Sequence, residues 1–480
     1  MSGATTIDMG VARGGWVTRA LLASAAVVGL AACGRDEAPA PAPPAEITAF
    51  PGAEGFGRHA RGGRGGDVMF VTTLAEEGPG SLRACVEADR PRVCVFRVGG
   101  VIRYEKTRPP IINNPFITIA GQTAPGGGVL ITHSGGDVGF TPITVKNTND
   151  VVVRHVRVRA DKRSNDRNGN DAVVIENSVN VVIDHVSTSW AEDENINGFG
   201  DNDNVTISWS IFAEGLQDHD KCALLGGKPI DPQHISFVRN LCAHNGDRNP
   251  DANFPPQSCI EVVNNVIYHG KSEFLEVWET YGGTPISVVG NYFKAGPETP
   301  TGTPAVKRLT LSSAGRASIY LHDNHIDAPD EDGLLAQSQN VASVLVDAPT
   351  CPLAVTPTSA LEAYVEVLDS AGAMPRDSFA QRIVSDVRLR SGSYVNKPGV
   401  LPAIAGRAPP EDLDSDGMAD SWERINGADE YAFDAWDDAD GDGWTNLDEY
   451  LDYAHRQLLA NHAQKLRERA SRTGIDGGAR

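Results

Sequence analysis

The sequence predicts an all-β protein, a parallel β-helix, with a small C-terminal α-helical calcium-binding module. Three observations lead to this fold class. Short β-branched runs, such as residues 151–153 and 181–183, are typical of strands. These runs return at a nearly constant step through the middle of the chain. An acidic segment near the C-terminus carries two calcium-loop patterns.

The repeated strands share a corner position. Aligning six copies of the run places these residues at equivalent positions: His155, His185, Trp209, Asn240, Asn265 and Asn291. The steps between them are 30, 24, 31, 25 and 26 residues, which indicates a solenoid whose loops absorb the variation. Asparagine tolerates left-handed backbone at a corner and stacks on its own copies. A β-sandwich would need hairpin turns, and Asn-Gly and Asp-Gly pairs are scarce here. We interpret His185 and His244 as corner packing residues.

Composition shifts divide the chain into five expected parts. Residues 1–32 are a signal peptide, 33–49 a linker rich in proline and alanine, and 50–405 the β-helix. Residues 406–452 form the calcium module, and 453–480 a basic tail. Within the β-helix part, residues 359–392 turn helical and are expected to pack along the outside of the strands.

The N-terminus resembles a bacterial lipoprotein signal. Arg13 and Arg19 precede an apolar run over residues 20–30, which is too short to span a bilayer comfortably. The run ends in Leu-Ala-Ala-Cys, a lipobox-like sequence closing on Cys33. This resemblance implies a membrane anchor through a lipidated Cys33, at the outer membrane or cell surface. The alternative is an ordinary signal peptide and a secreted protein.

Export places the other six cysteines in an oxidising compartment, where an even number favours disulfides. Cys85 and Cys94 flank a short loop and are the first expected pair. Cys222 with Cys242 is the second. Free buried thiols are the alternative for the later four, which include Cys259 and Cys351.

The net charge of −21 is concentrated in one segment. Residues 411–452 hold sixteen Asp and Glu against one basic residue, Arg424, which gives −15 and leaves −6 for the rest of the chain. An acidic protein is a poor partner for nucleic acid. A polyanionic sugar remains possible if the cleft itself is cationic. We expect a monomer.

The acidic segment fits the EF-hand loop twice. The first loop offers Asp412, Asp414, Asp416, Met418 through its carbonyl, Asp420 and Glu423. The second offers Asp438, Asp440, Asp442, Trp444 through its carbonyl, Asn446 and Glu449. Carboxylates this crowded repel one another without a cation, so we expect structural calcium here.

The expected chemistry lies between residues 169 and 248. Asp171, Asp193 and Asn197 supply oxygen ligands suited to a hard metal ion. Lys221 and Arg248 follow on later repeats and supply positive charge for an acidic substrate.

Several segments, in order, resemble the pectate lyase family of polysaccharide lyases. They are residues 49–57 (AFPGAEGFG), 80–83 (GSLR), 183–185 (IDH) and 247–250 (DRNP), and the resemblance covers residues 50 to about 400. It implies a right-handed parallel β-helix that cleaves pectate (polygalacturonate) or a related uronate polymer by β-elimination. It also implies calcium bound by Asp171, Asp193 and Asn197, a substrate-binding Lys221, and Arg248 as the group that takes the proton.

The sequence departs from the family pattern at two points. Gly169 stands where a further acidic ligand occurs, and Asn197 is neutral, which favours weak calcium binding. Asn253 stands where many members have a second arginine. A free guanidinium, with a pKa above ~12, is a poor base, so Arg248 needs surroundings that disfavour its charge.

Two other functions stay open from the sequence. A β-helical glycoside hydrolase would use paired carboxylates. Asp193 and Glu194 are adjacent, however, and on a strand they would point to opposite faces, which weakens that option. A non-catalytic glycan-binding or adhesive β-helix would explain the absent second arginine.

Overall fold

The structure is a computed structural model that describes residues 47–133, 140–161, 169–330 and 333–473. The chain divides into two units, residues 1–44 and 45–480, and all described residues belong to the second. The expected signal peptide, Cys33 and most of the linker therefore lie outside the described residues. Of the expected tail, residues 453–473 are described.

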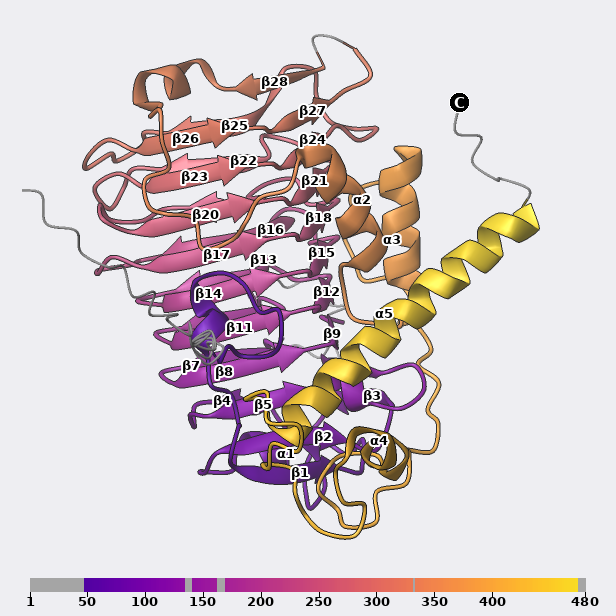
Figure 1. The fold of residues 1–480 in the computed structure, drawn as a ribbon. Helices are drawn as coiled ribbons and strands as arrows, with labels where there is room; N and C mark the ends of the chain where they lie inside the picture. Colours follow the sequence, from indigo (N-terminus) through magenta and orange to yellow (C-terminus); the bar gives the residue numbers. More distant parts are fainter. Residues whose placement is uncertain (1–46, 134–139, 162–168, 331–332, 474–480) are drawn as a thin grey trace, which may run out of the picture. The chain divides into compact units, whose positions relative to one another are not determined.

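The predicted parallel β-helix is confirmed: three parallel sheets wind around one core (Figure 1). Each complete coil contributes one strand to sheet A, one to sheet B and one to sheet C, and β1 adds a tenth strand to sheet A. Sheet A has ten strands: β1 (Asp67–Val71), β2 (Arg92–Phe96), β5 (Ile117–Ala120), β8 (Asn149–Arg154), β11 (Val179–Asp184), β14 (Asp203–Ser208), β17 (His234–Val238), β20 (Cys259–Val263), β23 (Pro285–Val289) and β26 (Ser318–His322).

Sheet B has nine strands: β3 (Gly100–Tyr104), β6 (Val129–His133), β9 (Val156–Arg159), β12 (Ser187–Ser189), β15 (Ile211–Ala213), β18 (Leu241–Ala243), β21 (Val266–Tyr268), β24 (Tyr292–Lys294) and β27 (His325–Asp327). Sheet C also has nine: β4 (Ile111–Ile112), β7 (Ile143–Lys146), β10 (Val173–Glu176), β13 (Glu194–Phe199), β16 (Lys221–Gly227), β19 (Asp251–Ala252), β22 (Leu275–Trp278), β25 (Thr303–Leu309) and β28 (Leu334–Gln337).

The core is built from aliphatic side chains stacked in register. In sheet A, Val151, Val181 and Val205 pair across successive coils, and Ile235, Ile260 and Ile286 continue the same row. All six are buried. Because a strand alternates its side chains between two faces, the other face of each strand is free to carry polar groups.

The corner between sheets A and B differs from the prediction by one residue. The left-handed position is held by His155, His185 and Trp209, as expected, but then by Arg239 and Asn264. The predicted Asn240, Asn265 and Asn291 come one residue later and lack positive φ. The stacking is nevertheless confirmed, since Asn240 N–H donates to Asn265 Oδ1 (2.8 Å) and Asn265 N–H to Asn291 Oδ1 (2.9 Å). The stacked asparagine side chains accept hydrogen bonds from buried backbone N–H groups. The residue before Asn240 and the residue before Asn265 provide the left-handed turn.

Three disulfides join the cysteines. Cys85–Cys94 and Cys222–Cys242 confirm the two expected pairs. The third, Cys259–Cys351, shows that free thiols were the wrong alternative for the later cysteines. Cys85 lies on the short helix α1 (Leu82–Val86), whose N-cap Ser81 accepts a hydrogen bond from Ala84 N–H.

The helical segment after the last coil packs on the outside of the strands, as predicted, and the sheet it covers is sheet B. Helices α2 (Ala360–Ser370) and α3 (Ser378–Leu389) lie beside the strands of this sheet (Figure 1). Their residues Val367, Ile383 and Val387 share one buried cluster with Leu241 and Tyr268 of sheet B. A 3₁₀ helix, η3 (Gln339–Val344), precedes them. Sheet B therefore faces helices.

The C-terminal segment contains helices α4 (Asp420–Asn426) and α5 (Asn446–Thr473). Met418, Trp422 and Leu447 pack on Val93 and Val95 of β2, outside the first coils. Helix α5 crosses the boundary expected at residue 452, so the last calcium-loop residues and the start of the expected tail form one helix. No helix within the described residues has the length and apolarity to cross a membrane.

The segment over residues 49–57, which contains three glycines, packs across sheet A. The 3₁₀ helix η1 (Phe56–His59) lies over β11 and β14, and Gly57 N–H donates to Thr206 Oγ1 (2.9 Å). A Cβ on Gly57 would lie 2.6 Å from Val181 O, so only glycine fits this close approach. A third 3₁₀ helix, η2 (Gly121–Thr123), follows β5.

Candidate active site

The predicted site residues gather at the start of sheet C. Glu194 of β13 pairs in register with Lys221 of β16, and Lys221 forms a bridge with Asp247. Further along the strands, Asn197 pairs with Leu224, and Leu224 with Asp251. Successive coils thus carry charged residues side by side along one edge of the sheet.

Three carboxylates converge at this edge. Asp171, Asp193 and Glu194 each offer an oxygen within 4.8 Å of the other two. Asp171 accepts hydrogen bonds from Glu194 N–H (2.9 Å) and from Asn197 Nδ2 (3.0 Å). Burial, followed by repulsion from Glu194, raises the pKa of Asp171 well above its usual value. A cation would relieve this repulsion, so the residues present fit a calcium ion.

Arg248 contacts this cluster directly. Its Nη1 forms an ion pair with Glu194 Oε1, and its Nε lies 3.5 Å from Asp251 Oδ2. Burial lowers the pKa of Arg248. The negative charges of Glu194 and Asp251 raise it by more, so the pKa of Arg248 lies above its ordinary value. Among the protein's own groups, Arg248 is therefore a charged partner of Glu194. The expectation that its surroundings, calcium included, disfavour this charge stays a prediction.

Glu194 is the site residue that the sequence analysis missed. Its side chain is 1% exposed and contacts both Arg248 and Asn197. We expected Asp193 and Glu194 to point to opposite faces, and this is wrong, because Asp193 belongs to the turn and only Glu194 begins the strand. Asp193 instead lies 3.1 Å from His219 Nδ1. The signal that could have found Glu194 is its position directly beside Lys221 on the neighbouring strand. This position is known only once the fold is known.

The two departures from the family pattern have visible surroundings. A Cβ on Gly169 would lie 3.7 Å from Asp193 Oδ2, so a side chain here would point toward the carboxylate cluster. Asn197 Oδ1 is buried and finds no hydrogen-bond partner among the described residues. A buried oxygen without a partner is suited to a cation. Asn253 Oδ1 is also buried and has no hydrogen-bond partner within the described chain.

Comparison with known proteins decides the family. "Probable pectate lyase C" of Aspergillus fumigatus is 34% identical over 403 residues, which cover 80% of this chain and 88% of the relative. The protein of the same name in Emericella nidulans is 32% identical over 436 residues, covering 86% and 92%. The chain belongs to the pectate lyase family.

The similarities found among solved structures have TM-scores below 0.5. A pectate lyase of Bacillus sp. N165 in complex with trigalacturonate has a TM-score of 0.44 and 18% identity, covering 67% of this chain and 99% of that one. The cedar pollen allergen Jun a 1 has a TM-score of 0.46 and 17% identity, covering 67% and 92%. No family model matches the chain.

Outside the pectate lyase coils, the first C-terminal loop also gathers carboxylates. Oxygens of Asp412, Asp414 and Asp416 lie within 4.8 Å of one another, and a second such group joins Asp416, Glu423 and Asp434. Both carboxylate oxygens of Glu423 are buried and lack hydrogen-bond partners in the described chain. These features fit a calcium ion. Asp434 lies outside the twelve-residue pattern, so the sequence motif alone missed it.

The remaining residues of the two loops have other positions. Asp420 begins α4, and its Oδ1 accepts the N–H of Leu413 (2.9 Å). In the second loop the carboxylates accept backbone hydrogen bonds within the loop, for example Asp438 from Gly441 N–H (2.7 Å) and Asp442 from Trp444 N–H (2.8 Å). Repulsion from Asp440, Asp442 and Asp438, after burial, raises the pKa of Glu449. Calcium binding by either loop stays a prediction.

The first loop gives a prediction on pH dependence. Burial, together with repulsion from neighbouring carboxylates, raises the pKa of Glu423 to about 8. Burial also raises the pKa of Asp416 to about 7, although a backbone hydrogen bond opposes this rise. Unfolding returns both groups to about 4, so the unfolded chain binds fewer protons between these values. Without calcium, the free energy of unfolding should fall as pH rises from about 5 to 8, and the melting temperature in EDTA should be lower at pH 8 than at pH 6.

The experiment is thermal unfolding, followed by tryptophan fluorescence, because Trp422 is buried in this region. Calcium should raise the melting temperature most at pH 8. In Glu423→Gln, the dependence on pH in EDTA should become weaker. Equal melting temperatures of the wild type in EDTA at both pH values would contradict the assignment.

Proposed function

We propose that this protein cleaves pectate, or a related uronate polymer, by calcium-dependent β-elimination. The observation that supports this most strongly is that Lys221 and Arg248 border one carboxylate cluster at the edge of sheet C. The relatives are named pectate lyases, which favours the same substrate class here.

The reaction removes a proton from the sugar carbon next to the carboxylate. The C–H electron pair forms a double bond to the neighbouring carbon as the bond from that carbon to the glycosidic oxygen breaks. The leaving oxygen then takes up a proton. Negative charge develops on the uronate carboxylate during proton removal, so positive groups fixed beside it lower the barrier.

Calcium, when bound, would supply positive charge at that carboxylate. Asp171, Asp193 and Glu194, together with the unpaired Oδ1 of Asn197, would hold it. Lys221, on the strand beside Glu194, would bind the substrate carboxylate. The net negative charge of the chain would then not prevent an acidic polymer from binding, because Lys221, Arg248 and calcium would place positive charge at the site.

Arg248 takes the proton in this proposal, and Glu194 controls when it does so. While Glu194 pairs with Arg248, it stabilises the charged guanidinium. A cation held by Glu194 would take this partner from Arg248 and would lower the pKa of Arg248 toward that of a usable base. Because Glu194 would be shared between Arg248 and the cation, full activity would require alkaline conditions.

The test is incubation with polygalacturonate and calcium, followed by the absorbance of unsaturated uronate. Arg248→Lys should lower turnover by at least ~10²-fold while substrate affinity stays within about tenfold, ~1.4 kcal/mol. Arg388→Lys, an ion-paired arginine on the surface of α3, is the control and should keep full activity.

Each other outcome is informative. New reducing ends without the chromophore would indicate hydrolysis by paired carboxylates. Binding without cleavage would favour the adhesive function. A Lys variant that keeps most of its turnover would remove Arg248 from the role of base.

Gly169 provides a gain-of-function prediction. Its φ of +64° is tolerated by Asp and Asn, and its Cβ direction leads toward Asp193. Gly169→Asp should add a ligand and lower the half-saturating calcium concentration of lyase activity by about tenfold. Gly169→Asn has the same backbone cost without the charge and should have a smaller effect. Equal effects of Asp and Asn would show that no carboxylate at this position reaches the cation.

For location, we propose an exported protein anchored through lipidated Cys33. The supporting observation is the lipobox-like sequence before it. Several acyl chains are needed for stable anchoring, since each buried methylene contributes about 0.8 kcal/mol and one chain alone binds marginally. In a Gram-negative host, the wild type should fractionate with membranes and Cys33→Ser with the soluble fraction. A wild type found only in the soluble periplasm would leave a secreted protein.

A further inference from the structure

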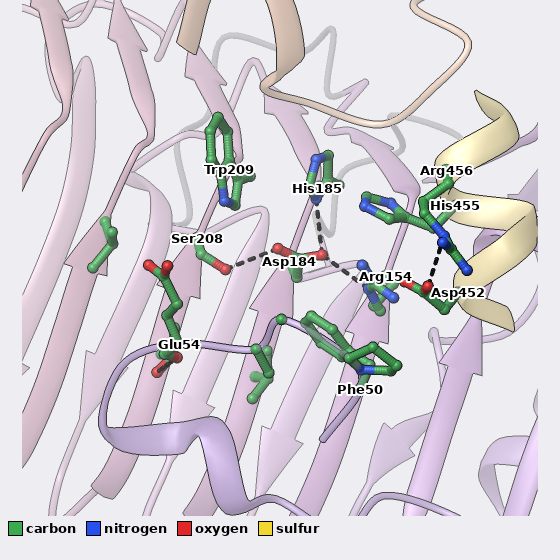
Figure 2. Close-up of a pocket in the computed structure, with 16 residues that line it drawn as sticks. Phe50, Glu54, Arg154, Asp184, His185, Ser208, Trp209, Asp452, His455 and Arg456 are labelled. Carbon is green, nitrogen blue, oxygen red and sulfur yellow. Dashed lines mark hydrogen bonds and ion pairs between the residues drawn. The ribbon is translucent and has the colours of Figure 1, made fainter. Parts of the chain in front are cut away.

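A second cluster of ligating side chains lies at the corner between sheets A and B. His155 and His185 occupy this corner on consecutive coils. Figure 2 shows His185 on its coil and His455 approaching it from helix α5. Each offers a ring nitrogen, and the three nitrogens lie within 4.8 Å of one another. The candidate active site is elsewhere, at the start of sheet C, so this cluster has no part in the proposed β-elimination.

The hydrogen bonds fix which nitrogen of His185 is available. Its Nδ1 lies 2.8 Å from Asp184 Oδ2, and a carboxylate accepts, so Nδ1 carries the proton. Nε2 is then left with a lone pair, and this buried atom has no hydrogen-bond partner in the described part of the chain. Asp184 is itself held by Arg154 Nε (2.9 Å) and Ser208 Oγ (2.9 Å). A histidine oriented by a carboxylate that is held in turn is the arrangement of a metal ligand with its outer shell.

The other two histidines share one proton. His155 Nε2 lies 2.8 Å from His455 Nδ1, and His155 Nδ1 accepts the N–H of Met374 (3.2 Å). The proton between the two rings therefore belongs to His155 Nε2, and His455 Nδ1 accepts it. Burial lowers the pKa of both imidazoles, which keeps them neutral, the form that binds metals.

We propose that His155, His185 and His455 bind a transition metal ion of the zinc class, which fastens helix α5 to two consecutive coils of the β-helix. Three imidazole nitrogens suit zinc, cobalt, nickel or copper and do not suit calcium. The ion takes the place of the proton between His155 and His455. For this, the His155 proton moves from Nε2 to Nδ1, and the N–H of Met374 gives up its contact.

The site has room for a fourth ligand. A cavity of about 330 Å³ adjoins the cluster, and Phe50, Glu54, Arg154, Trp209 and Arg456 are among the residues that line it (Figure 2). Three histidines with an open position toward such a cavity leave the fourth place to water or a small anion. Arg154 and Arg456 at the wall are ion-paired with Asp184 and Asp452, and Glu54 also lines the cavity, so water suits the fourth place better than an anion.

The experiment uses the full chain, stripped with EDTA and then saturated with calcium so that the carboxylate sites are occupied. Cobalt(II) should bind at one equivalent and give the intense visible absorption of a tetrahedral site, and zinc should displace it. His455→Ala should weaken this binding by at least ~100-fold. The matched control is His462→Ala, seven residues further along the same helix, and it should bind like the wild type.

His455 lies outside the lyase site, so its variant should keep lyase activity in calcium, and circular dichroism verifies its fold. A second measurement needs no variant: zinc should protect His455, the partly exposed member of the cluster, from modification by diethyl pyrocarbonate, as mapped on peptides. Absence of the visible band would overturn the proposal. So would cobalt binding unchanged in His455→Ala, or equal modification of His455 with and without zinc.

Discussion

In a parallel β-helix, each side chain lies directly beside the residue at the same position of the next coil, about 4.8 Å away. Every property of a position is therefore repeated along the molecule. Aliphatic rows benefit from this repetition, as in the row from Val151 to Ile286. Asparagine rows also benefit, because each side chain accepts the amide of the preceding coil and donates to a carbonyl. Both rows stabilise the scaffold without any ligand.

The same stacking is unfavourable when the repeated group is charged. At the edge of sheet C it brings Asp171, Asp193 and Glu194 together, and burial with mutual repulsion raises the pKa of Asp171 and Glu194. The next coils carry two cations, Lys221 and Arg248, and Arg248 forms an ion pair with Glu194. Proteins retain such costly arrangements chiefly where function depends on them. The corner histidines are a milder case, since neutral rings can stack: His155 and His185 have ring centroids 4.8 Å apart.

The periodic features of this molecule could be predicted from the sequence, and the positions set by individual contacts could not. The repeat indicated the coils because stacking requires like residues at a fixed step, and two cysteine pairs followed from short spacing. The left-handed residue was placed on Asn240 instead of Arg239 because both positions recur with the same period. Glu194 was missed because strand alternation was applied across a turn. Asp434 and His455 join their clusters from distant positions, and no local pattern marks them.

The charge balance of the candidate site explains how a chain of net charge −21 can take a polyanion. Asp171, Asp193 and Glu194 contribute −3 when ionised, and Lys221 with Arg248 contributes +2, so the five side chains sum to −1. In the proposed function, a calcium ion would change this sum to +1, which would attract one uronate carboxylate. Glu276 nearby adds little negative charge, because burial raises its pKa to about 11. Asp251, whose pKa burial raises to about 7, is ionised under alkaline conditions and offsets part of the charge of Arg248. With neutral Asn197 and Gly169 the sum over the five side chains and the ion would stay positive, whereas a fourth carboxylate would hold the cation more tightly and attract the substrate less. Weak calcium binding would thus leave positive charge available to the polymer.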